Sequence, residues 1–287
     1  MTQIIPTAEP FFFPGSGENA KIGCLLIHGF TGAPKEMRWM GEYLNREHGF
    51  SCLGVRLAGH ATQPEDMLRS RYTDWLASVE DGYHLLRGVA EQIYLVGLSM
   101  GGILSLVTAT RLEACPEGKA RRIAGVVVMS TPYKLPDDPR LRWVRQISCF
   151  IPFMPKGRED PGADWFDQEA FKQHVAYPKN PLRAVGELNQ LMAVMHESLP
   201  EVRAPVLLIH SRDDDYVVKD SMAQIYAHLG SSDKQMLWIE GSGTSSPKSR
   251  SASWFSRPPR ISSAGSTHRR VRGERRENKN SALSAVK

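Results

Sequence analysis

The chain has 287 residues, of which 41% are hydrophobic and 23% charged, so it is long enough for one large α/β domain of ordinary globular composition. Its net charge of +5 comes from the end of the chain, because residues 244–287 hold 11 Lys/Arg against 2 Asp/Glu, whereas residues 1–243 hold 25 Lys/Arg against 29 Asp/Glu. The basic balance therefore gives no reason to expect a nucleic-acid partner or a membrane-binding surface.

The cysteines and the N-terminal residues also limit the kinds of protein that this chain can be. The four cysteines show no metal-ligand spacing, so we expect no metal and read them as buried, reduced thiols: Cys24, Cys52, Cys115 and Cys149. The N-terminus has no basic region followed by a long apolar stretch, which predicts neither a signal peptide nor a stable membrane anchor. We expect a cytoplasmic protein and leave its oligomeric state open.

Strand-like and helix-like segments alternate along the chain, which is typical of a mostly parallel sheet with helices on both faces. Strands are expected at residues 22–27, 51–55, 93–96, 123–129, 205–209 and 235–239. Helices are expected from Pro34 to Gly49 with Met37, Met40 and Leu44 buried, and from a Thr73 cap with Leu76, Val79, Tyr83 and Leu86 buried. Further helices are expected at residues 102–109 and 220–228.

The alternation stops between about residues 131 and 202, where no clear strand is expected. This stretch holds an apolar patch that includes Ile151 and Phe153, and one amphipathic helix over residues 182–199. So long an interruption between two strands is usually a functional insertion. We therefore predict a core from 1–131 and 203–243, a helical cap over 132–202, and a disordered basic tail over 244–287.

The most informative motif follows the strand at 93–96, where residues 97–101 read Gly-Leu-Ser-Met-Gly and lead into a helix. A strand, a Gly-x-Ser-x-Gly turn and a helix in this order form a nucleophile elbow, which makes Ser99 the candidate nucleophile. A serine of this kind needs backbone donors for an oxyanion. We assign these donors to the amides of Met100, directly after the serine, and of Phe30, in the His-Gly loop after the strand at 22–27. His28 is expected to order that loop rather than act as the base.

The acid that orients the base is expected after the strand at 205–209, where three aspartates are adjacent. The usual pattern is a small residue, two further residues, the acid, two further residues and a valine. With Ser211 first and Val217 last, this spacing selects Asp214. Asp213 and Asp215 are then solvated turn residues.

These motifs together resemble the bacterial carboxylesterase and monoacylglycerol lipase branch of the α/β-hydrolase superfamily. The matching segments read LLIHGFTG from residue 25, LAGH from 57, GLSMGG from 97 and PVLLIHSRDD from 205, and the resemblance covers roughly residues 9–243. It implies an eight-strand core, a small helical cap, no metal or cofactor, and hydrolysis of short- to medium-chain esters or monoacylglycerols. We expect a small-molecule ester substrate and a pocket formed by Phe30, Ile151 and Phe153.

The chain departs from the family pattern after its last strand. The pattern there is Ser-Gly-His followed by a closing helix, whereas this chain has Thr244 at the position of the histidine. One hypothesis is a frameshift: CAC GTC ATC ACC encodes His-Val-Ile-Thr, and reading one base later gives Thr-Ser-Ser-Pro, as found at residues 244–247. We therefore expect the closing helix to be missing and ester turnover to be low.

Two alternatives remain from the sequence. One is a non-catalytic protein that keeps the acyl pocket and binds fatty acids or esters without turnover. The other is a peptidase or acyltransferase on the same scaffold, against which the apolar character of the cap argues weakly.

Overall fold

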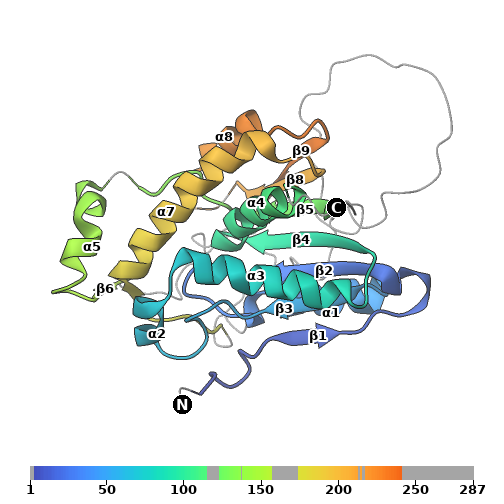
Figure 1. Ribbon diagram of the computed structural model, residues 1–287, viewed down its shortest axis with the longest axis horizontal. Coiled ribbons are helices and arrows are strands. Elements are labelled where there is room, and N and C mark those ends of the chain that lie inside the picture. The colour runs from blue at the N-terminus through green and yellow to red at the C-terminus, as the bar shows by residue number, and fades with distance from the viewer. Residues whose placement is uncertain are drawn as a thin grey trace.

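The computed structural model describes residues 3–114, 123–136, 138–156, 174–212, 214 and 217–240. A seven-stranded sheet with the order β1-β3-β2-β4-β5-β8-β9 forms its centre (Figure 1). The strands are β1 (Phe11–Phe13), β2 (Ile22–Ile27), β3 (Ser51–Val55), β4 (Gln92–Leu98), β5 (Ile123–Met129), β8 (Val206–Ser211) and β9 (Lys234–Ile239). Every neighbouring pair is parallel except β1 and β3, which confirms the mostly parallel sheet.

Helices cover both faces of this sheet. On one face the core contains α3 (Tyr72–Arg87), α4 (Met100–Glu113), α7 (Leu182–Ser198) and α8 (Asp220–His228), and Figure 1 shows α3 and α4 lying side by side over the strands. On the other face, α1 (Lys35–His48) buries Met37, Met40 and Leu44 against β1, β2 and β3. The buried stripes predicted for both early helices are therefore confirmed.

Local chemistry explains where these two helices begin and end. Helix α1 ends at Gly49, whose φ of +70° is the left-handed conformation that glycine adopts most easily. The predicted cap at Thr73 is wrong, because α3 begins at Tyr72 and Arg71 is its N-cap. The carboxylate of Asp74 accepts the Arg71 amide N–H at 2.8 Å, and this contact sets the start of the helix.

The structure differs from the sequence expectations in its shortest strands. β6 (Phe153–Pro155) and β7 (Lys179–Pro181) pair as a small antiparallel sheet inside the segment expected to have no clear strand. Strands of three residues are too short to show periodicity. The main sheet has seven strands in the described part of the chain, one fewer than the resemblance implied. Residues 3–10 form no strand before β1, and they contain Pro6 and Pro10, which cannot donate to a ladder.

The predicted cap region holds η2 (Pro139–Trp143), α5 (Val144–Ile147), β6, β7, α7 and η3 (Leu199–Glu201) within its described residues. Two short helices precede α3 in the core, η1 (Gly17–Lys21) and α2 (Pro64–Arg69). The predicted tail over 244–287, and with it the expected loss of a closing helix, lies outside the described residues. None of the helices that the structure describes is long and apolar enough to cross a membrane.

The cysteines differ in their exposure. Cys24 and Cys52 are free and buried on neighbouring strands, as expected, whereas Cys149 is exposed and the expectation of burial was wrong there. Cys149 follows α5, a single helical turn of the cap segment. Cys115 lies outside the described residues.

Candidate active site

The candidate site lies where the parallel strands end. Loops with polar residues follow the carboxyl ends of β2, β4, β5 and β8, which are four consecutive strands of the sheet. In parallel sheets these ends face one edge, and ligands bind there. The topology therefore brings Ser99, the loop from His28, Thr131 and Asp214 to one edge of the sheet.

Ser99 occupies a strained turn between β4 and α4. Its φ of +54° and ψ of −117° lie in a region that side-chain-bearing residues rarely adopt. Three hydrogen bonds hold it: its N–H donates to Met129 O at 2.8 Å, and its C=O accepts from the Gly102 N–H and from Thr131 Oγ1, both at 3.0 Å. Such strain, fixed by the surrounding structure, is typical of a functional residue.

Glycines allow the elbow to pack this tightly. A Cβ atom on Gly97 would lie 2.1 Å from Gly101 O, and one on Gly101 would lie 2.2 Å from Ile27 O. Both contacts involve backbone atoms, which cannot rotate away as a flexible side chain could. The start of α4, which carries the Met100 amide, is thus pressed against the end of β2.

The loop after β2 lies beside the serine. A Cβ on Gly29 would be 3.5 Å from Ser99 Cβ, and the ring of Phe30 packs edge-on against Trp75 at 6.2 Å. His28 is fully buried and orders this loop, with Nδ1 2.9 Å from Gly29 O and Nε2 3.3 Å from the Leu57 N. The second contact makes Nε2 an acceptor, so the proton belongs on Nδ1.

Electrostatics agree with that assignment. Burial lowers the pKa of His28 to about 4, so the imidazole is neutral at pH 7. His28 therefore has the role of a structural residue, as the sequence predicted. His60 is fully buried and packs edge-on against His28 at 5.0 Å.

Asp214 follows β8 and is 9% exposed. Its Oδ1 accepts the Val217 amide N–H at 3.0 Å, and its Oδ2 lies 3.4 Å from His210 Nε2. β8 is separated from the serine's strand only by β5. Asp213 and Asp215, the residues next to Asp214, lie outside the described residues.

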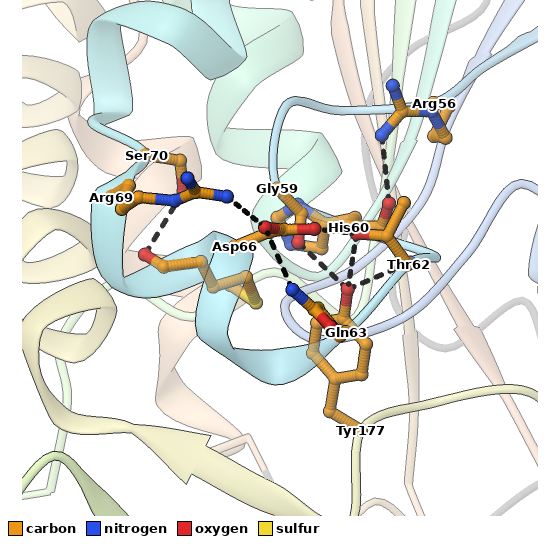
Figure 2. A network of polar contacts seen from close by, with 10 residues as sticks. Arg56, Gly59, His60, Thr62, Gln63, Asp66, Arg69, Ser70 and Tyr177 are labelled. Atoms are coloured by element: carbon orange, nitrogen blue, oxygen red, sulfur yellow. Dashed lines mark hydrogen bonds and ion pairs between the residues drawn. The ribbon is translucent and has the colours of Figure 1, made fainter. Parts of the chain in front are cut away.

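The cap returns to the core through Tyr177. Its hydroxyl donates to Gly59 O and accepts the Thr62 N–H, both at 2.9 Å, and Thr62 Oγ1 donates to the Asp66 carboxylate at 2.8 Å (Figure 2). The Tyr177 N–H also donates to Thr31 O at 2.9 Å in the loop beside the serine. Sequence reasoning missed this tether, since contacts more than 100 residues apart leave no local pattern.

The predicted pocket residues of the cap lie on and near β6. Ile151 is 56% exposed, and Phe153 is half-buried opposite Pro181. A cavity of about 350 Å³ lies instead between the segment after β5 and α7. It is lined by Tyr133, Lys134, Leu135, Asn189, Met192 and His196, among others. His196 Nε2 lies 2.7 Å from Tyr133 O, and their rings stack at 4.2 Å on one wall of this cavity.

The last predicted feature of the site, Thr244 at the expected histidine position, lies outside the described residues. Within the described part of the chain, no three His, Cys, Asp or Glu side chains gather as a metal site would require.

A strained serine at a strand-to-helix turn of a parallel sheet, beside a His-Gly loop, defines a serine hydrolase of the α/β-hydrolase fold. Residues 18–243 match the family described as "Serine aminopeptidase, S33", and the chain belongs to that family.

Individual relatives agree with this assignment. A thermostable monoacylglycerol lipase from Bacillus sp. (strain H-257) is 33% identical over 246 residues, covering 83% of this chain and 87% of the relative. A carboxylesterase from Bacillus subtilis (strain 168) is 31% identical over 245 residues, covering 83% and 89%.

Solved structures show the same fold. One reported for the metagenome-derived lipolytic enzymes LipS and LipT has a TM-score of 0.72 at 32% identity, covering 84% of this chain and 91% of the other. The monoacylglycerol lipase of Paleococcus ferrophilus has a TM-score of 0.64 at 18% identity, covering 82% and 89%, and shares the fold.

Proposed function

We propose that this site hydrolyses carboxylic esters of short to medium acyl chains, or monoacylglycerols, through an acyl-Ser99 intermediate. The strained backbone of Ser99 carries the proposal, because this residue lies at the sheet edge beside the loop of Phe30. Relatives named as a carboxylesterase and a monoacylglycerol lipase support the substrate class.

The proposed chemistry runs in two steps. Ser99 Oγ attacks the ester carbonyl carbon and gives up its proton to a base, and the amide N–H groups of Phe30 and Met100 stabilise the resulting oxyanion. Collapse of the tetrahedral intermediate releases the alcohol, which takes up that proton. Water then attacks acyl-Ser99, releasing the carboxylic acid and restoring the serine. Asp214 orients the base.

The base is the weak point of this particular sequence. The family pattern places a histidine where this chain has Thr244. Loss of one triad member costs up to about 10⁶-fold in turnover, and the oxyanion hole and binding leave roughly 10³-fold over water. We therefore propose slow turnover for the chain as written, with a frameshift at Thr244 as its origin. The nucleotide sequence across codons 240–260 tests the origin: the idea fails if the alternative frame encodes no apolar helix.

A fluorophosphonate probe tests the function. Slow but specific labelling is expected in the full chain, lost in Ser99→Ala and accelerated by Thr244→His if the following residues can fold. Labelling that persists in Ser99→Ala would refute Ser99 as the nucleophile. Binding of a fatty acid with no labelling at all would favour the non-catalytic alternative. Cleavage of peptide amides in preference to p-nitrophenyl butyrate would favour a peptidase.

The setting of this reaction belongs to the same proposal. We place it in the cytoplasm, with buried free thiols at Cys24 and Cys52 in support. A small ester is its partner, and neither nucleic acid nor a cofactor takes part. The division into a core, a cap over 132–202 and a tail over 244–287 is proposed with it.

A further inference from the structure

Gly29, which precedes the proposed Phe30 donor, is held through both of its backbone polar groups. The Gly29 N–H donates to Glu36 Oε2 at 3.0 Å, and the Gly29 C=O accepts from the Gly32 N–H at 3.2 Å and from His28 Nδ1 at 2.9 Å. In a trans peptide the C=O and the following N–H point in opposite directions. The bonds to the Gly29 C=O therefore set the direction of the Phe30 N–H, and Glu36 restrains the same residue through the preceding peptide.

Glu36 comes from the first turn of α1 and inserts its carboxylate beneath this loop. Its side chain is only 13% exposed. Gly32 leaves it room, because a Cβ there would lie 2.2 Å from Glu36 Oε1. Burial raises the pKa of Glu36 to about 7. A buried carboxyl group is costly unless its oxygens are hydrogen-bonded, and here Oε2 accepts the Gly29 N–H.

Both flanks of the cap meet at this carboxylate and at the neighbouring Thr31. Lys156, after β6, donates from Nζ to Thr31 Oγ1 at 2.8 Å, and His174 Nε2 lies 3.7 Å from Glu36 Oε1. Thr31 has a φ of +60°, an unfavourable conformation for a β-branched residue, and its carbonyl accepts the Tyr177 N–H. The strained residue of the loop is thus held by residues that precede and follow the middle of the cap.

We propose that Glu36 is a positioning residue that couples the cap to the oxyanion loop. Lys156 holds the neighbouring Thr31 and attracts the Glu36 carboxylate by its charge, and His174 lies beside that carboxylate. The carboxylate in turn fixes the Gly29 backbone, which directs the Phe30 N–H at the reacting oxygen. This role rests on the proposed function, in which that N–H stabilises the oxyanion. Glu36 does not touch the substrate. Its removal loosens a donor without removing a binding contact, so it lowers kcat rather than raising KM.

The test combines hydrogen–deuterium exchange of the peptide covering residues 28–34 with kinetics on p-nitrophenyl butyrate in the full chain. In Glu36→Ala we expect exchange at least about tenfold faster and kcat lower by about tenfold, with KM within about twofold, since loss of a whole donor costs roughly 10²–10³-fold. Glu36→Gln keeps an acceptor for the Gly29 N–H and is expected to fall in between. Lys156→Met should shift both readouts in the same direction as Glu36→Ala.

Two matched variants control for charge. The first is Glu47→Gln: Glu47 lies on the same helix, its side chain is 46% exposed, and its carboxylate pairs with Arg46. The second is Lys179→Met: Lys179 lies on β7 opposite Pro155. Neither should change exchange or kcat. If Glu36→Ala fails to fold, the isosteric Glu36→Gln carries the test.

Unchanged exchange in the Glu36 variants would overturn the proposal, and so would faster exchange with unchanged kcat. If the unaltered chain shows no turnover above Ser99→Ala, the proposed ester hydrolysis fails, and the exchange data then decide alone whether Glu36 positions the loop.

Discussion

Replacing Gly101 by alanine tests the claim that close backbone packing sets the elbow. The new Cβ would lie 2.2 Å from Ile27 O and 2.8 Å from His28 O. An ordinary carbon contact needs about 3.5 Å, so the start of α4 and the end of β2 must separate by about 1 Å. Because both obstacles are backbone atoms, the cost should reach the upper end of overpacking penalties, about 3 kcal/mol in the free energy of unfolding. The melting temperature should fall by about 6–10 °C.

The same shift moves Ser99 and the Met100 amide away from the loop of Phe30. A displacement of this size should slow fluorophosphonate labelling by about 10²-fold. Urea unfolding followed by circular dichroism measures the stability, and mass spectrometry measures the labelling rate. Gly88→Ala is the control, because Gly88 has a φ of −68° and its nearest neighbour to a Cβ is Leu85 O at 3.2 Å, so we expect a change within about 0.5 kcal/mol. A loss below about 0.5 kcal/mol in Gly101→Ala would refute the reasoning.

Three further substitutions give distinct outcomes. Ser99→Gly relieves the strain at φ +54° and should raise the free energy of unfolding by about 1 kcal/mol while abolishing labelling; a loss of stability in urea would contradict this. Thr131→Val removes the hydrogen bond to Ser99 O and should cost about 1 kcal/mol in the same assay, so no change would count against it. Glu36 has a pKa of about 7 in the fold against its usual 4.5, so between these pH values the folded chain keeps a proton that the unfolded chain has lost. The free energy of unfolding should therefore fall by about 3 kcal/mol as the pH rises from 4.5 to 7. Glu36→Gln should flatten that fall and be more stable than the unaltered chain at pH 8; melting curves with the same pH slope for both proteins would rule this out.

Local patterns account for most of the fold that the sequence predicted. Apolar runs long enough to be buried strands and stripes at helical spacing place β2, β5, α1 and α3, because burial acts through periodicities of two to four residues. Periodicity does not predict very short strands. β1, β6 and β7 have three residues each, and they form because neighbouring strands supply their hydrogen bonds. The start of α3 was misplaced because the carboxylate of Asp74 competes with Thr73 as the capping group.

In the proposed site, too, residues within local motifs could be predicted and residues placed by distant contacts could not. Ser99, Met100 and Phe30 could be proposed from the sequence because the elbow and the His-Gly loop are compact motifs. Their glycines are required where a side chain would clash with nearby backbone. Glu36 could not be selected, since a glutamate in the first turn of a helix is common on surfaces, and only its burial beneath Gly32 and Gly29 distinguishes it.

The sequence by itself determined the order of strands and helices, the strained serine turn and the family, because these depend on residues close together along the chain. Only the tertiary structure decided that Lys156, His174 and Tyr177 converge on the loop from residue 28. Their contacts span more than 100 residues, and hydrogen bonds over such separations form wherever packing brings donor and acceptor within about 3 Å, which no local pattern records.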